Sequence, residues 1–241
     1  MSISEIISPN VKAILALGIE RDTPFELDAL LHKNGVIEIN TSLDLLPEVD
    51  RAFEIFDQLG AVYPVSVTGL ENVDSGIGSH RFCAWDGEFA ALLTEVVKLM
   101  ETPELIQIGD HLWEFESVSK YFRFMRYDQG GEHFPHYDSD FVVYDHLKTF
   151  GQSVRYATKY SLVMYFNDCE SGEIAFIDND PNPTKGDWNR QATDAEISLR
   201  IKPAKGKIVL FPHTLCHTVL PFTDKDSQRF IVRGDLIFTQ A

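Results

Sequence analysis

The segment that decides the fold reads FRFMRYDQGGEHFPHYD and runs from Phe122 to Asp138. It begins as a strand, turns at two glycines, and continues as a second extended segment that carries His136 and Asp138. Side chains two residues apart lie on one face of an extended chain, so this imidazole and this carboxylate can point at the same position. They supply two of the three protein ligands of a 2-His-1-carboxylate iron site.

The third ligand has to come from a distant part of the chain, and two histidines stand close together after a later apolar strand. The strand GKIVLFP, residues 206–212, is followed by His213 and His217. On residue type alone, either histidine can complete the site. Zinc accepts the same donors, so the ligands by themselves leave a zinc site open. The plainer alternative is that these histidines are ordinary polar residues at strand ends.

Six sequence elements resemble, in order, the catalytic domain of prolyl 4-hydroxylases and related Fe(II)/2-oxoglutarate dioxygenases. They are Tyr127, His136-Tyr137-Asp138, the run YFNDCESGE at 165–173, Phe211-Pro212-His213, His217 with Pro221, and Arg229-Phe230. In this register His213 takes the family's non-ligand position. The resemblance therefore makes His136, Asp138 and His217 both the metal ligands and the catalytic centre.

The chain departs from the family pattern in two places. Arg229 follows His217 at a greater spacing than the family's basic residue usually shows, which predicts a longer hairpin at 223–227. The acidic run has Ser171-Gly172-Glu173 where Gly-Gly-Glu is common. No metal ligand lies there, so the second departure does not affect the predicted metal site.

The resemblance also implies a set of co-substrate contacts. Arg229 matches the cation that grips the far carboxylate of 2-oxoglutarate, and Tyr127 and Met164 are candidates to line the same pocket. Arg233 shares a strand face with Arg229. We leave three roles open for Arg233: co-substrate binding, binding of a substrate carboxylate, or an internal salt bridge.

The chemistry implied by the resemblance is decarboxylation of 2-oxoglutarate by O2 to succinate and CO2, coupled to hydroxylation of an unactivated C–H bond. Fe(II) is the expected metal, and ascorbate is a candidate additional cofactor. Asp138 favours hydroxylation over halogenation, because halogenating relatives lack the acidic ligand. The expected substrate is a prolyl residue of a peptide or protein, or an amino-acid-like small molecule. The alternative from another class is a non-catalytic jelly-roll protein that binds metal or 2-oxoglutarate as a sensor.

Composition narrows the partners of the protein. The 241 residues include 21 Lys and Arg against 37 Asp and Glu, a net charge of −16, which argues against nucleic acid and anionic membranes as partners. The three cysteines form no spaced pair, and the apolar run at 13–19 is too short to cross a bilayer. These features predict an intracellular, cytoplasmic protein.

The pattern of apolar residues predicts a mainly β fold with flanking helices (α+β), built on a double-stranded β-helix, the cupin-like jelly roll. We expect residues 1–118 to form a helical and strand region that packs on the barrel, and residues 119–241 to form the catalytic core of one continuous domain. Helices are predicted at 47–59 and after an N-cap at Asp86. Strands are predicted at 61–67, 112–116, 121–127, 160–166, 173–177, 198–201, 207–211 and 229–238. Loops are predicted at 72–80, 139–159 and 179–195. The last two are expected to act as lids over the metal, and the loop at 139–159 is expected to select the substrate.

Overall fold

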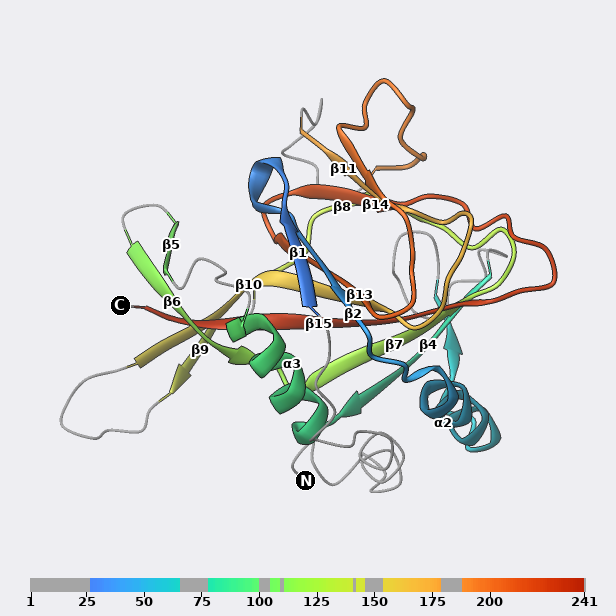
Figure 1. The fold of residues 1–241 in the computed structure, drawn as a ribbon, viewed down its shortest axis with the longest axis horizontal. Coiled ribbons are helices and arrows are strands. Elements are labelled where there is room, and N and C mark those ends of the chain that lie inside the picture. Colours follow the sequence, from blue (N-terminus) through green and yellow to red (C-terminus); the bar gives the residue numbers. More distant parts are fainter. Residues whose placement is uncertain are drawn as a thin grey trace.

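The computed structural model describes residues 27–65, 78–99, 105–108, 111–140, 142–145, 154–178 and 188–240. Over these residues the protein is mainly β, with two α-helices and a short 3-10 helix, η2 (Lys33–Gly35). Figure 1 shows three layers: a small sheet, a large sheet, and the helices beneath the large sheet. The two sheets facing one another form the predicted jelly roll.

The large sheet contains eleven strands in the described part of the chain. Eight of them run in the order β1 (Leu27–Leu31), β2 (Ile37–Thr41), β13 (Lys207–Pro212), β10 (Val154–Tyr165), β15 (Arg229–Gln240), β7 (Tyr121–Tyr127), β4 (Ser79–Trp85) and β3 (Tyr63–Pro64). The other three are β5 (Leu105–Ile108), β6 (His111–Val118) and β9 (Val142–Asp145). All of these pairings are antiparallel.

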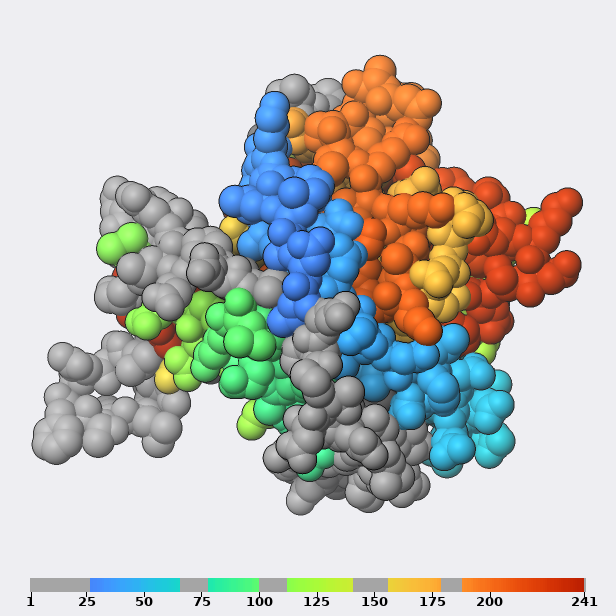
Figure 2. Space-filling view, viewed as in Figure 1, coloured from blue at the N-terminus to red at the C-terminus, as the bar shows by residue number. Residues whose placement is uncertain are grey.

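The small sheet contains four strands in the order β12 (Leu199–Ile201), β11 (Ile174–Ile177), β14 (Cys216–Val219) and β8 (His133–His136). In the space-filling view, the orange-coloured residues that follow Trp188 gather at the end of the molecule that holds this sheet (Figure 2). Because β8 comes last in this strand order, it is an edge strand, and within the described residues it pairs with β14 alone.

The two faces of the large sheet have different roles because side chains alternate along each strand. On β7, Phe122 and Phe124 point toward the helices, whereas Arg123, Met125 and Tyr127 line the space between the sheets. The helices α2 (Leu46–Gln58) and α3 (Gly87–Leu99) cover the first face with apolar side chains. This packing fixes the position of the strands from which the polar face projects.

A stack of phenylalanines anchors the sheet to helix α2. The ring centroid of Phe82 lies 4.3 Å from that of Phe56 on α2 and 4.9 Å from that of Phe124 on β7, with both pairs nearly parallel. Phe53 meets Phe82 edge to face at 4.8 Å. Aromatic pairs of this kind add to the free energy gained from burial alone.

Both helix predictions are confirmed. Helix α2 begins at Leu46 with Pro47 in its first turn. Helix α3 is capped by Asp86, whose Oδ1 accepts hydrogen bonds from the backbone N–H groups of Glu88 at 3.0 Å and Phe89 at 2.9 Å. The long connection predicted at 223–227 is present but is not a hairpin, because β14 (Cys216–Val219) and β15 lie in different sheets. Asp224 on this connection accepts hydrogen bonds from the N–H of Glu170 and the hydroxyl of Ser171.

The predicted strands from 112 onward all correspond to observed strands. The loop predicted at 139–159 is wrong at 142–145 and from 154 onward, which form strands, and residues 141 and 146–153 lie outside the described residues. Strand β10 already begins at Val154, and Val142–Asp145 form β9 beside it. The cause is the length of β15. Its residues Phe238 and Thr239 pair with Ala157 and Tyr156 and so extend β10. The predicted strand at 61–67 is short, with Tyr63–Pro64 paired to β4. Parts of the predictions at 61–67, 72–80 and 179–195 fall on residues 66–77 and 179–187, which lie outside the described residues.

The region before residue 119 contributes strands to the same sheet as the catalytic core. Strand β2 pairs with β13, and β4 pairs with β7.

Within the described residues, neither α-helix has the length and apolar character needed to cross a bilayer. The apolar run at 13–19 lies outside the described residues.

We expect Asp86→Ala to lower the free energy of unfolding by about 1 kcal/mol, because two N–H groups at the start of α3 lose their acceptor. Urea unfolding of the variant against the wild type measures this loss. Asp86→Asn, which keeps a capping oxygen, should retain most of the stability. An equal loss in both variants would show that the cap is not the source of the effect.

Candidate metal centre and co-substrate pocket

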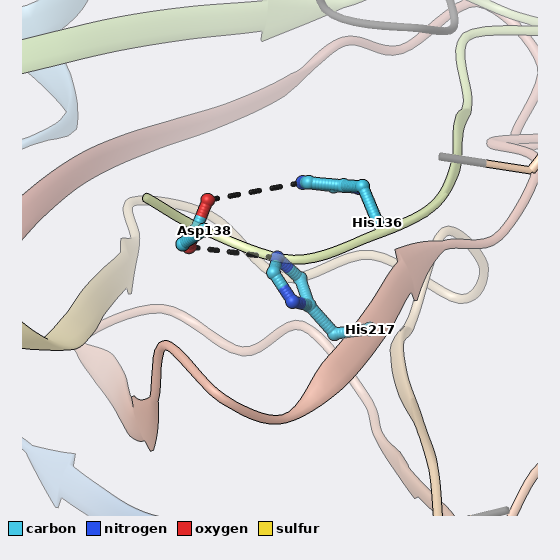
Figure 3. A group of neighbouring side chains, drawn as sticks. All are labelled: His136, Asp138 and His217. Carbon is cyan, nitrogen blue, oxygen red and sulfur yellow. Dashed lines mark ion pairs between the residues drawn. The ribbon is translucent and has the colours of Figure 1, made fainter. Parts of the chain in front are cut away.

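Three side chains meet between the two sheets (Figure 3). His136 ends β8, Asp138 follows two residues later, and His217 lies opposite His136 on the paired strand β14. The Nε2 atom of His136 lies 3.9 Å from Asp138 Oδ1, and Nε2 of His217 lies 3.7 Å from Asp138 Oδ2. Their ligand atoms all fall within 4.8 Å of one another, so one metal ion can contact all three.

Backbone carbonyls set the tautomer of both imidazoles. Nδ1 of His136 lies 2.7 Å from the carbonyl oxygen of Phe134, and Nδ1 of His217 lies 3.2 Å from that of Leu215. A carbonyl only accepts, so each Nδ1 carries the proton and each Nε2 offers a lone pair toward Asp138. Burial, together with the neighbouring His136, lowers the pKa of His217 to about 3. The ring is therefore neutral at neutral pH, as a metal ligand must be.

Side chains from the large sheet bind both carboxylate oxygens of Asp138. Burial raises the pKa of this carboxyl group, but Arg233, the two histidines and the Ser161 hydroxyl outweigh burial and hold the pKa well below its usual range. Arg233 Nη2 lies 2.7 Å from Oδ1, and Ser161 donates a short hydrogen bond to Oδ2. The carboxylate is thus ionised and oriented, and the donor set fits a divalent metal.

Ser161 is a site residue that the sequence reasoning missed. It lies on β10, is fully buried, and pairs across the sheet with Asp235 on β15 and Phe211 on β13. The signal was present, because Ser161 is a small polar residue directly before the apolar and aromatic run from Leu162 to Phe166. Nothing in that run indicated which distant carboxylate the hydroxyl would reach.

The other candidate histidine, His213, lies outside the metal cluster. Its Nδ1 is 3.0 Å from Asp140 Oδ1, and its Nε2 is 3.4 Å from Asp235 Oδ1. Cys216 packs with Ile177 and Trp188 on the other side of β14 from His217, as strand alternation predicts.

Arg229 is almost completely buried, with 1% of its surface exposed, and its guanidinium lies 4.1 Å above the ring of Tyr127. One nitrogen, Nη1, donates to the carbonyl of Gly172, while Nε and Nη2 have no hydrogen-bond partner among the described residues. No carboxylate of the described residues forms an ion pair with it. A buried charge without an anion is costly, so these unpaired donors fit a carboxylate ligand.

Gly172 makes room for this arginine. Its φ of 78° lies in the left-handed region, and an added Cβ would overlap the Arg229 guanidinium. The long connection between β14 and β15, which carries Asp224, is hydrogen-bonded to the neighbouring Ser171. The two departures from the family pattern therefore lie together beside Arg229.

The predicted co-substrate residues do not all reach one cavity. Tyr127, Arg229 and Arg233 line the same pocket as His136 and His217. Tyr127 is buried, and burial raises the pKa of its hydroxyl, which lies 3.8 Å from the sulfur of Met125.

The placement of Met164 in this pocket is wrong. Met164 packs in the core between the large sheet and the helices, whereas its neighbours Val163 and Tyr165 line the pocket. The prediction therefore assigned this part of β10 the wrong face. The internal salt bridge left open for Arg233 is present, as its contact with Asp138 shows.

A 2-His-1-carboxylate cluster inside a jelly roll, beside a buried arginine that no carboxylate of the described residues neutralises, is typical of the class of non-haem Fe(II) oxygenases. Residues 122–234 match the family model of the 2OG-Fe(II) oxygenase superfamily. Members of that superfamily use Fe(II), 2-oxoglutarate and O2. The matched segment contains all six motifs, so the match supports the predicted resemblance to Fe(II)/2-oxoglutarate dioxygenases.

Distant structural matches exist along most of the chain. A prolyl-4-hydroxylase from Pseudomonas putida aligns at 14% identity and a TM-score of 0.46, covering 95% of this chain and 98% of that one. A prolyl hydroxylase from Trichoplax adhaerens, solved with a hypoxia inducible factor peptide, aligns at 15% identity and a TM-score of 0.48, covering 98% and 93%. A non-heme alpha ketoglutarate dependent carbocyclase from nogalamycin biosynthesis aligns at 13% identity and a TM-score of 0.49, covering 99% and 86%. None of the curated proteins matches the chain in sequence.

We expect Ser161→Ala to weaken metal binding by roughly ten- to a hundredfold, the range typical for loss of a group that orients a ligand. Competition with a chromophoric chelator measures this affinity. Ser79→Ala is the matched control, because Ser79 is a buried strand serine whose hydroxyl bonds to the Val65 carbonyl instead. Wild-type affinity in Ser161→Ala would contradict the role assigned to this hydroxyl.

Proposed function

We propose that the protein is an Fe(II)- and 2-oxoglutarate-dependent hydroxylase in which His136, Asp138 and His217 hold the metal. The observation that carries this proposal is the pairing of that cluster with Arg229 in one cavity. A zinc hydrolase has no need of a second, buried cation, whereas a dicarboxylate co-substrate needs one for its far carboxylate. The unpaired nitrogens of Arg229 therefore favour the oxygenase over the zinc alternative.

When bound, iron and 2-oxoglutarate supply the oxidising chemistry, with succinate and CO2 as the products of the co-substrate. The chain's own contribution is to bind and orient. Asp138 remains ionised because Arg233 and Ser161 stabilise its negative charge. Apolar side chains such as Ile231 and Val163 line the cavity and limit the access of water to the reacting centre.

Arg229, rather than Arg233, is the proposed anchor for the far carboxylate of 2-oxoglutarate. Arg233 already contacts Asp138 at 2.7 Å, so its positive charge is neutralised by that carboxylate. Arg229 lies four residues away along β15, above Tyr127, and has two nitrogens available. Tyr127 is proposed to form the floor under the guanidinium.

The proposed substrate is a prolyl residue of a peptide or protein, or an amino-acid-like small molecule. We also propose that residues 1–118 and 119–241 form one continuous domain, supported by the pairing of β2 with β13 and of β4 with β7. An intracellular location is proposed from the cysteine spacing alone.

The experiment that tests the function is oxygen-dependent conversion of 2-oxoglutarate to succinate by protein loaded anaerobically with Fe(II), in the presence of ascorbate. We expect turnover in the wild type, stimulated by one class in a panel of prolyl peptides and free amino acids, and its loss in His217→Ala. Product mass spectrometry identifies the hydroxylated member. Firm binding of metal and 2-oxoglutarate without succinate formation would favour a non-catalytic sensor instead.

We expect Arg229→Gln to raise the KM for 2-oxoglutarate by roughly ten- to a hundredfold, because a charge-assisted contact worth about 1.5–3 kcal/mol is lost. Arg233→Gln should alter metal affinity and leave the KM for 2-oxoglutarate much closer to that of the wild type. Steady-state assays with varied 2-oxoglutarate measure both. The reverse pattern would assign the co-substrate to Arg233.

A further inference from the structure

His213, the histidine that lies outside the metal cluster, is buried between two carboxylates, with 3% of its surface exposed. Its Nδ1 lies 3.0 Å from Asp140 Oδ1, and its Nε2 lies within ion-pair distance of Asp235 Oδ1, at 3.4 Å. A buried imidazole with a carboxylate at each ring nitrogen is held in one orientation. Both carboxylates lead back to the metal ligand Asp138, by two different routes.

The first route is the backbone, because Asp140 follows Asp138 by two residues. Strand β8 ends at His136, and residues 137–140 belong to no helix or strand. Sites built on helices and strands are more precise than sites on irregular segments, so an irregular segment needs side-chain contacts to fix it. The carboxylate of Asp138 is itself bound to the large sheet, and Asp140 attaches the same segment to that sheet a second time.

Lys159 also binds Asp140, and a bulge in β10 directs it there. The pairing of β10 with β15 shifts between Thr158 and Tyr160, so Lys159 is the extra residue of the bulged strand. Bulges redirect a side chain and are frequent next to active sites. The ammonium group of Lys159 forms an ion pair with Asp140 Oδ2, while His213 contacts Oδ1. Both carboxylate oxygens of Asp140 are therefore bound.

The two side chains that bind Asp140 are joined to each other through the backbone. The N–H of His213 donates a hydrogen bond of 3.0 Å to the carbonyl oxygen of Lys159, where β13 ends beside β10. A few residues further on, the same two strands pair Leu210 with Leu162 in the apolar core. Asp140 has 37% of its side chain exposed, so these two contacts, rather than burial, determine where it lies.

The second route is a chain of ion pairs through Asp235. This carboxylate lies 3.5 Å from Arg233, which in turn contacts Asp138 at 2.7 Å. Burial raises the pKa of Asp235, but His213 and the neighbouring arginines outweigh burial and hold the pKa below its usual value. The contacts of Asp235 with His213 and Arg233 are longer than the roughly 2.7–2.9 Å of a strong charged hydrogen bond. The route through Asp140 is therefore the stronger one.

We propose that His213 is a positioning residue of the metal centre, which fixes the segment that carries Asp138 through its contact with Asp140. The inference rests on the proposed function, because it concerns the same metal cluster. With residues 137–140 already ordered, metal binding does not have to bear the cost of ordering them. His213 thus adds to the metal affinity without touching the metal.

The test is anaerobic competition for Co(II) between the protein and a chromophoric chelator. Co(II) is the probe because its visible absorption spectrum reports the geometry of its ligands. We expect Asp140→Ala and His213→Gln each to weaken Co(II) binding roughly tenfold, the lower end of the range for groups that orient a ligand. Both should also change the spectrum of the bound ion, which a loss of stability alone would not do.

Two isosteric variants of His213 separate the routes. The amide nitrogen of Asn occupies the position of Nδ1 and can still donate to Asp140, whereas that of Gln occupies the position of Nε2 and faces Asp235. We therefore expect His213→Asn to keep most of the wild-type affinity that His213→Gln loses. Urea unfolding of the metal-free proteins checks that each variant folds. Because Asp140 is partly exposed, Asp140→Ala carries the test where a variant of His213 fails to fold.

His32→Gln is the matched control, because His32 and Lys207 bind one carboxylate, that of Glu38, in a group to which no metal ligand belongs. His32 Nε2 lies 3.2 Å from Glu38 Oε2, and Lys207 Nζ lies 2.7 Å from Oε1. We expect wild-type Co(II) affinity and an unchanged spectrum in this variant.

Wild-type Co(II) affinity in both Asp140→Ala and His213→Gln would overturn the positioning role, even where stability falls. So would equal losses in His213→Asn and His213→Gln with wild-type affinity in Asp140→Ala, because His213 would then act through Asp235. Both results require a wild type that binds Co(II). A wild type that binds none would contradict the proposed function itself, so the two failures are distinguishable.

Discussion

The site depends on one carboxylate that both sheets hold. Asp138 follows the small-sheet strand β8, yet its oxygens are bound by Ser161 and Arg233 from the large sheet. The sheets are therefore joined at the point where a metal would bind, and the separation of the two histidines from the large sheet is fixed by this contact. Asp138 stays ionised because Arg233 and Ser161 stabilise its negative charge. Removing either the charge or its partner from such a buried pair is strongly destabilising.

Strand alternation connects this contact to the rest of the molecule. On β7 and β15, every second side chain packs into the phenylalanine core under helix α2, which makes the strands rigid. The side chains between them carry the charge: Arg123, Arg229 and Arg233 all face the cavity. A rigid apolar layer on one face thus allows several guanidiniums to be held on the other, at defined distances from the metal cluster.

Much of the site could be predicted from sequence because its chemistry is local. The spacing of His136 and Asp138 needs only the period of a strand, and the capping of α3 by Asp86 needs only its side-chain type. The roles of Ser161 and Met164 depend on which face of β10 meets the cavity. Strand alternation separates the two faces but does not say which of them faces the cavity until the neighbouring strands are known.

The most direct test of the account is a crystal structure of the protein with Mn(II) and 2-oxoglutarate, prepared without oxygen. We predict that the metal binds to His136, Asp138 and His217 and that Arg229 binds the far carboxylate of 2-oxoglutarate. A metal bound elsewhere, or a co-substrate carboxylate held by Arg233 with Arg229 left unpaired, would contradict it.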